Sequence, residues 1–164
     1  MLKFDLKTRL LVYVALIIAA ASILFWFMGT ALITDGTLNR DYSFLNVTFG
    51  IAETTIAGFS IGLGFSIVNF FTFLFLVLGT LTLIFGALWT HKLNGWIRVL
   101  AALVLITGGI MIFFVGNYAN PLEQLTELTM SYATLGWGIY LVGILSILAG
   151  VIVLVDRFIL KNKL

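Results

Sequence analysis

Residues 65–96 read FSIVNFFTFLFLVLGTLTLIFGALWTHKLNGW, and this stretch decides the fold. Its first part, residues 65–89, carries no charged side chain and exceeds the length of about 20 apolar residues that a helix needs to cross a bilayer. A short connection, Thr90–Gly95, follows and contains the turn signal Asn-Gly. A second apolar run begins at Trp96. Because the connection is so short, we expect the two runs to form antiparallel, neighbouring helices.

Two more apolar runs of similar length flank this pair, so the chain carries four candidate spans. The composition agrees, because 62% of the residues are apolar and 10% are charged, whereas soluble domains contain about half and about a quarter. The first run exceeds the apolar core of a signal peptide, about 7–15 residues, and is interpreted as a retained helix. We predict one all-α integral membrane domain, a left-handed bundle of four transmembrane helices. The predicted spans are about 10–29, 65–89, 96–116 and 134–155, with outer segments at about 30–64 and 117–133.

The charged residues predict the orientation of these spans. Eight of the nine Lys and Arg residues fall on one side of a four-span threading, and five of the seven acids fall on the other. Basic residues favour the cytoplasmic side, so we expect both termini to be cytoplasmic. Arg98 and Asp156 lie at span ends, where long side chains can reach the headgroups. The basic residues on the cytoplasmic side are Lys3, Lys7, Arg9, Lys92, Arg98, Arg157, Lys161 and Lys163.

The first outer segment carries alternating apolar residues. The alternation runs over residues 45–51 and again over residues 59–65, with Ala52–Thr54 as a candidate turn. This pattern is typical of a β-hairpin, whose edges could pair with neighbouring chains. The alternative interpretation is a loop folded over the helix ends, with Phe59–Ser66 as the beginning of the second span. Asn46-Val47-Thr48 is also a glycosylation sequon, which makes Asn46 a candidate acceptor.

The second outer segment has the pattern of a helix start. Asn120 is a candidate N-cap, Pro121 suits the first helical position, and Glu123 stands at the third. The sequence therefore predicts a short helix over about Pro121–Met130, lying at the outer interface or running into the fourth span.

Each predicted span carries three small residues spaced seven apart. Small residues let membrane helices approach closely, and a heptad keeps them on one seam of a left-handed bundle. Shifts of 87 and 64 residues superimpose the first and second spans on the third and fourth, which suggests two related helical hairpins. The predicted helix-packing residues are Ala15, Ser22, Gly29, Thr72, Gly79, Gly86, Ala102, Gly109, Gly116, Gly136, Gly143 and Gly150.

The sequence offers little for catalysis. It has no cysteine and one histidine, His91, so a metal or haem site built from several such side chains is excluded. It also carries no P-loop, nucleophile elbow or paired carboxylates, so we expect no enzyme activity and no cofactor. Asn69 is the most polar residue within a span. We interpret it as an interhelical hydrogen-bonding residue, with a role in lining a path for solute as the alternative.

The layout resembles that of claudin-type tetraspan proteins: four spans, both termini inside, and a larger first outer segment with strand-like patterning. The Trp…Gly-Leu-Trp…Cys…Cys signature of that family is missing, so the resemblance implies no site residue. We expect a non-catalytic accessory subunit that packs against lipid and against other membrane subunits or copies of itself. Nucleic acid is not an expected partner. Two alternatives remain, a small channel or carrier for an uncharged solute and a self-assembling adhesive tetraspan.

Overall fold

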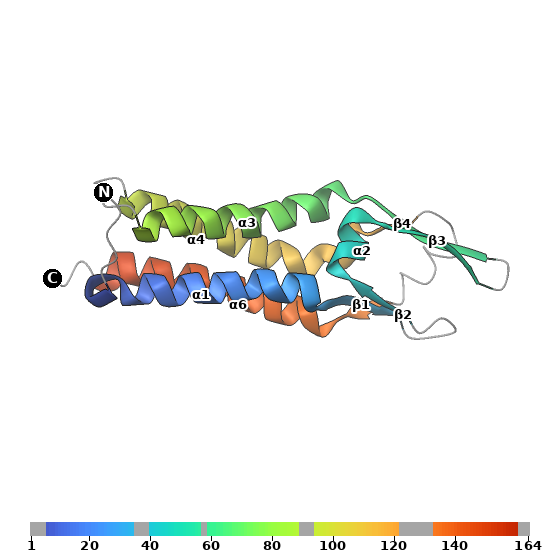
Figure 1. The fold of residues 1–164 in the computed structure, drawn as a ribbon, viewed down its shortest axis with the longest axis horizontal. Coiled ribbons are helices and arrows are strands. Elements are labelled where there is room, and N and C mark those ends of the chain that lie inside the picture. The colour runs from blue at the N-terminus through green and yellow to red at the C-terminus, as the bar shows by residue number, and fades with distance from the viewer. Residues whose placement is uncertain (1–5, 35–39, 57–58, 89–93, 122–132, 161–164) are drawn as a thin grey trace.

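Four long helices lie side by side along one axis of the molecule (Figure 1). The computed structural model describes residues 6–34, 40–56, 59–88, 94–121 and 133–160. The helices are α1 (Leu6–Met28), α3 (Ile67–Leu88), α4 (Asn94–Met111) and α6 (Trp137–Val155). Each of the four is long and apolar enough to cross a membrane, once the segments that prolong α4 and α6 are included. The prediction of four spanning-length helices is confirmed, with bounds that differ from the expected ones by a few residues.

Two of the long helices change geometry near one end. The 3₁₀ segment η1 (Ile112–Tyr118) prolongs α4, and the π-helical segment η2 (Asp156–Leu160) prolongs α6. The spanning lengths therefore become Asn94–Tyr118 and Trp137–Ile159. Helical segments of these two types have tighter or wider turns than an α-helix and frequently accompany functional or strained positions.

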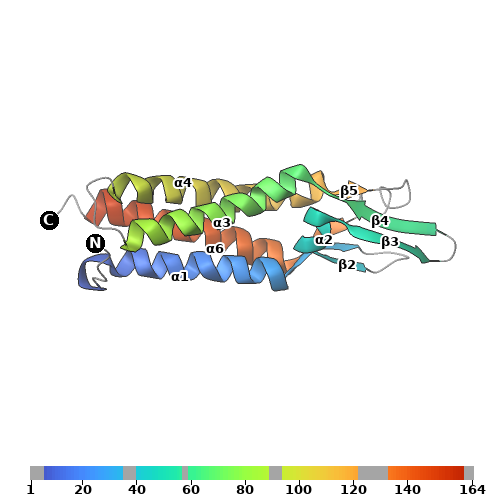
Figure 2. The same ribbon diagram turned by 45° about the horizontal axis from the view of Figure 1, so that its top comes forward.

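Two small antiparallel sheets stand at one end of the bundle, called here the sheet end (Figures 1 and 2). The first has the order β2-β1-β6 and the second the order β3-β4-β5, so each sheet includes a strand from the second outer segment. The strands are β1 (Thr30–Thr34), β2 (Arg40–Ser43), β3 (Ile51–Ile56), β4 (Phe59–Gly64), β5 (Asn120–Pro121) and β6 (Ala133–Leu135). The opposite end, where α1 and α4 begin and α3 and η2 finish, is called the basic end.

The hairpin expected from residue 45 onward is wrong in its first half. Residues Phe44–Phe49 form a short helix, α2, whose N-cap Ser43 accepts a hydrogen bond from the Asn46 N–H at 3.3 Å. The buried residues Phe44, Val47 and Thr48 have helical spacing, which the overlapping alternation concealed. Gly50, with φ of 89°, then leads into β3.

The expected turn is displaced as well. Ala52–Thr54 lies within β3, which pairs with β4 so that Ile56 stands opposite Phe59. A strand thus precedes α3, and α3 begins after Ser66 instead of at residue 65.

The helix expected to begin at Pro121 is also wrong at its start. Pro121 belongs to β5 and pairs with Leu63 of β4. The Asn120 side chain donates to the Phe65 carbonyl at 3.3 Å and is therefore not an N-cap. Proline is tolerated there because β5 is an edge strand. Residues 122–130 of the expected helix lie outside the described residues.

The four helices enclose a core along the whole bundle. Contacts are extensive between α3 and α4, between α4 and α6, and between α1 and α6, but much smaller between α1 and α3. A hairpin repeat would make the α1–α3 interface equivalent to the α4–α6 interface, so the packing departs from that symmetry. At the sheet end Trp26 of α1 stacks on Phe73 of α3 with ring centroids 4.3 Å apart. Toward the basic end the core is rich in alanine, including Ala15, Ala87 and Ala149.

Candidate functional site

A close helix contact joins the small-residue seams of α4 and α6. A Cβ built on Gly109 would lie 2.9 Å from the Gly143 carbonyl oxygen, and one on Gly150 would lie 2.7 Å from that of Ala102. Gly109 therefore faces Gly143, and Ala102 faces Gly150. At both of these pairs the two helix backbones come into close contact. A side chain on the glycine would keep them apart.

The glycines of α3 receive larger groups. A Cβ on Gly79 would lie 2.8 Å from the Leu105 side chain, and one on Gly86 would lie 2.8 Å from the Arg98 Cγ. Between α1 and α6, a Cβ on Gly29 would approach the Gly138 Cα to 2.8 Å. The glycines of α3 therefore act as sockets for side chains of α4.

The remaining predicted packing residues are mostly buried. Ala15, Ser22 and Thr72 are 0–2% exposed. Gly136 packs on the Thr30 carbonyl, whereas Gly116 is half-buried against Leu32. Of the twelve residues, all except Gly116 are thus buried in the chain's own interior.

Three hydroxyl groups inside the spans bond to their own helices. Ser22 donates to the Ala19 carbonyl at 2.8 Å, Thr72 to that of Val68 at 3.0 Å, and Thr80 to that of Leu76 at 2.8 Å. Such local bonds satisfy a hydroxyl without joining two helices.

At the sheet end, Ser66 and Asn69 form a polar cluster that joins three elements. The Asn69 side-chain amide donates to the Val47 carbonyl of α2 at 3.0 Å and to the Val115 carbonyl of η1 at 3.1 Å. Ser66 donates from Oγ to the Tyr118 carbonyl at 2.6 Å, and the same Oγ accepts from the Asn69 N–H at 3.3 Å. Asn69 is 2% exposed, and both of its amide hydrogens are used. These bonds hold α2 and η1 against the beginning of α3.

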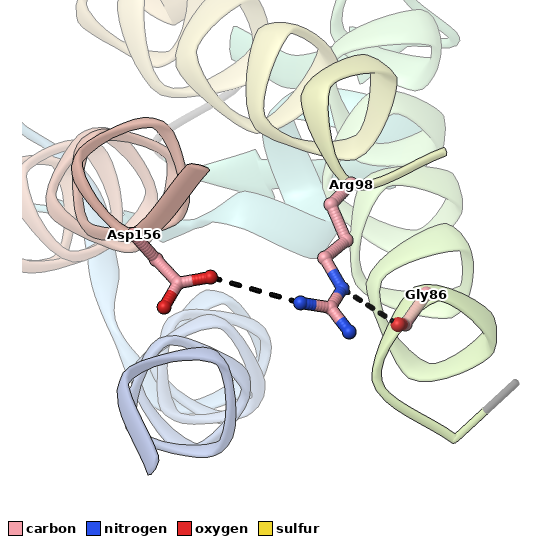
Figure 3. Close-up of polar contacts among 3 residues, drawn as sticks. All are labelled: Gly86, Arg98 and Asp156. Carbon is pink, nitrogen blue, oxygen red and sulfur yellow. Dashed lines mark hydrogen bonds and ion pairs between the residues drawn. The ribbon is translucent and has the colours of Figure 1, made fainter. Parts of the chain in front are cut away.

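At the basic end, Arg98 and Asp156 point toward each other between helices (Figure 3). Arg98 Nη1 lies 3.6 Å from Asp156 Oδ2, and Arg98 Nε donates to the Gly86 carbonyl at 2.7 Å. Their side chains are only 3% and 9% exposed. The expectation that they extend to the headgroups is therefore wrong, because the helix faces on which they stand turn them inward.

A sequence signal for this pair exists and was missed. Arg98 precedes the buried Leu105 by seven residues, and Asp156 follows the buried Ala149 by seven. Each charge therefore continues the buried face of its own helix. Position near a span end suggested headgroup contact, but the helical period decides which way a side chain points.

Both polar clusters satisfy carbonyls at helix ends. The last four carbonyls of an α-helix have no partner within it, and Val47 and Gly86 fall within the last four residues of α2 and α3. Asn69 caps the Val47 carbonyl and adds a second bond to the Val115 carbonyl of the 3₁₀ segment η1, and Arg98 caps the Gly86 carbonyl. In this arrangement Asn69 and Arg98 act as caps from neighbouring helices, through hydrogen bonds and charge.

Within the residues that the structure describes, no group of three His, Cys, Asp or Glu side chains could hold a metal ion. His91 lies outside those residues, and Asn46 is half-buried on α2. No protein-family model, curated protein or solved structure matches the chain.

Proposed function

We propose that this protein is a non-catalytic membrane subunit that packs through its helix faces, and through its outer segment, against other chains. The main support is how the described polar groups are used. Asn69 binds two carbonyls of neighbouring helical segments, Arg98 binds a third and pairs with Asp156, and three hydroxyls bond locally. These groups consolidate the bundle, so the outward faces remain for contact with partners.

The outward faces are broadly apolar. Large exposed side chains stand on every long helix, as at Ile17, Phe85, Ile110 and Ile144. Lipid tails can cover such apolar surfaces, and a helix of another subunit can cover them equally well. In this proposal both termini lie in the cytoplasm and the sheets lie outside, which the distribution of basic residues in the sequence supports.

Native mass spectrometry of membrane vesicles, without detergent purification, tests the proposal. We expect the 18.1 kDa chain to appear in assemblies that include a further polypeptide. Tryptophan substitutions at Ile17, Phe85, Ile110 and Ile144, made one at a time, should lower the assembled fraction at one or more faces without changing the melting temperature. A chain that is released only as a monomer with lipid, and is indifferent to all four substitutions, would contradict the proposal.

A second candidate, self-association through the outer segment, is favoured by one observation. Strand β3 is an edge of the β3-β4-β5 sheet, and such edges can take up another strand. Deleting α2 together with β3 would remove the buried residues Phe44 and Val47, so a single substitution is the better test. Thr55→Lys in β3 should abolish cross-linked dimers, and the matched edge substitution Thr134→Lys in β6 should leave them. Equal dimer yields in both variants would exclude this candidate.

A further inference from the structure

The second arginine at the basic end, Arg157, is placed differently from Arg98. It stands in η2 next to Asp156 and reaches the first turn of α4. A Cβ built on Gly95 would lie 2.7 Å from Arg157 Cζ and 2.9 Å from both Nε and Nη2. The guanidinium therefore rests directly on Gly95, and the missing side chain at that position makes room for it.

Within the described part of the chain, no carboxylate pairs with Arg157. Asp156, its neighbour, faces Arg98 instead. The structure thus holds this cation on the surface of α4, and the adjacent Asp156 pairs with another arginine. A cation that has no carboxylate partner among the described residues is suited to an external anion.

Exposed apolar residues adjoin Gly95 and Arg157 in the sequence and indicate the depth of this contact. Trp96, adjacent to Gly95, is 67% exposed, and Phe158 and Ile159, which follow Arg157, are 51% and 52% exposed. Exposed tryptophan near the end of a spanning helix marks the level of the lipid headgroups. Arg157, which rests on the residue before Trp96, therefore lies near the level of the lipid phosphates.

The charge of this end favours an anionic lipid over a neutral one. Eight of the nine basic residues lie, in the sequence, within a few positions of the ends of the helices that meet here. Clusters of this kind attract anionic headgroups within about 10 Å at moderate salt.

We propose that Arg157, seated on Gly95, binds the phosphate of an anionic phospholipid in the leaflet at the basic end. The guanidinium fork matches two phosphate oxygens, which an ammonium group cannot do with the same geometry. The exposed Trp96 and Phe158 contact the glycerol region and upper acyl chains. This inference needs the chain to lie in a bilayer and is independent of the proposed role as a subunit.

The test uses the full chain in nanodiscs made from equal parts of phosphatidylcholine and phosphatidylglycerol. Native mass spectrometry then measures which lipid stays bound after gentle release. We expect the wild type to retain phosphatidylglycerol preferentially, and Arg157→Gln to lower that preference several-fold. Arg40→Gln, an equal loss of charge in β2 at the sheet end, is the matched control and should keep it.

Two further variants separate geometry from charge. Gly95→Ala keeps every charge but displaces the guanidinium, and Arg157→Lys keeps the charge but removes the fork. Both should lower the preference, and Gly95→Ala remains informative if Arg157→Gln fails to fold. The proposal is overturned if Arg157→Gln matches the wild type, or if it and Arg40→Gln lose the preference equally. Complete displacement of the lipid by millimolar inorganic phosphate would also overturn it in favour of a free-anion site.

Discussion

The two ends of the bundle bury polar groups for the same reason but with different chemistry. At the sheet end the neutral amide of Asn69 binds the carbonyls of Val47 and Val115. At the basic end the charged Arg98 caps the Gly86 carbonyl and needs Asp156 as a partner. A buried neutral group costs a few kcal/mol at most when left unpaired, whereas a lone buried charge costs several. The comparison therefore predicts that the basic end is the more sensitive to a single substitution.

The largest effect is expected from Arg98→Met. It leaves Asp156 as an uncompensated buried charge and removes the donor to Gly86. Breaking such a pair typically costs about 3–5 kcal/mol. The free energy of unfolding, measured by denaturant titration in mixed micelles, should fall by that amount.

The double variant Arg98→Met/Asp156→Leu is the control for this prediction. Replacing both charges with apolar side chains removes the desolvation cost, so most of the lost stability should return. A double variant as unstable as Arg98→Met alone would mean that the cap on Gly86, and not the ion pair, dominates. The distinction between the two ends would then disappear.

Between the two ends, the α4–α6 seam sets the spacing of the helices. Gly109→Ala places a Cβ 2.8 Å from Ile147 Cγ1 and 2.9 Å from the Gly143 backbone oxygen, so the helices must separate. Overpacking of this kind costs about 1–3 kcal/mol, measurable by the same titration. Gly116→Ala is the matched control, because its Cβ would meet only the flexible end of Leu32. Similar losses of unfolding free energy in both variants would show that the backbone contact does not set the distance between α4 and α6.

Asn69→Leu should lower the free energy of unfolding by less than Arg98→Met or Gly109→Ala does. Two carbonyls lose this donor, but the carbonyls are neutral and hydrogen bonds within membrane proteins contribute modestly, so we expect a loss of about 1 kcal/mol. Hydrogen exchange should increase in α2 and η1 and remain unchanged around Arg98. An increase that spreads to the basic end would show that the two polar clusters are coupled.

The spans were predictable because hydropathy is read along the chain and needs no knowledge of neighbours. The buried pair was not predicted, although Arg98 and Asp156 each continue a buried heptad, because their meeting depends on the relative rotation of α4 and α6. Asn69 was predicted as a hydrogen-bonding residue. Its acceptors lie 22 and 46 residues away, and no local pattern identifies them.

The outer segments show a different limit. Over six residues, the alternating pattern of a strand and the spacing of a helix can coincide. Phe44–Phe49 is compatible with both patterns, and the N-cap Ser43 favours the helix that the structure shows. The pairing of β1 with β6 joins residues about a hundred positions apart. Which strands pair at such a separation depends on where the packed helices end in space. A three-residue strand such as β6 carries too little pattern to be recognised alone.

The smallest effect is expected from Thr80→Val. The Thr80 hydroxyl is buried like Asn69, but it donates to Leu76 of its own helix, whose carbonyl already has an intrahelical partner. Valine preserves the shape and removes a bond that joins no two elements, so the free energy of unfolding should change by less than about 0.5 kcal/mol. A loss equal to that of Asn69→Leu would mean that burial of a polar group matters more than which carbonyl it caps. In that case the helix-end carbonyls would no longer explain why these residues stand where they do.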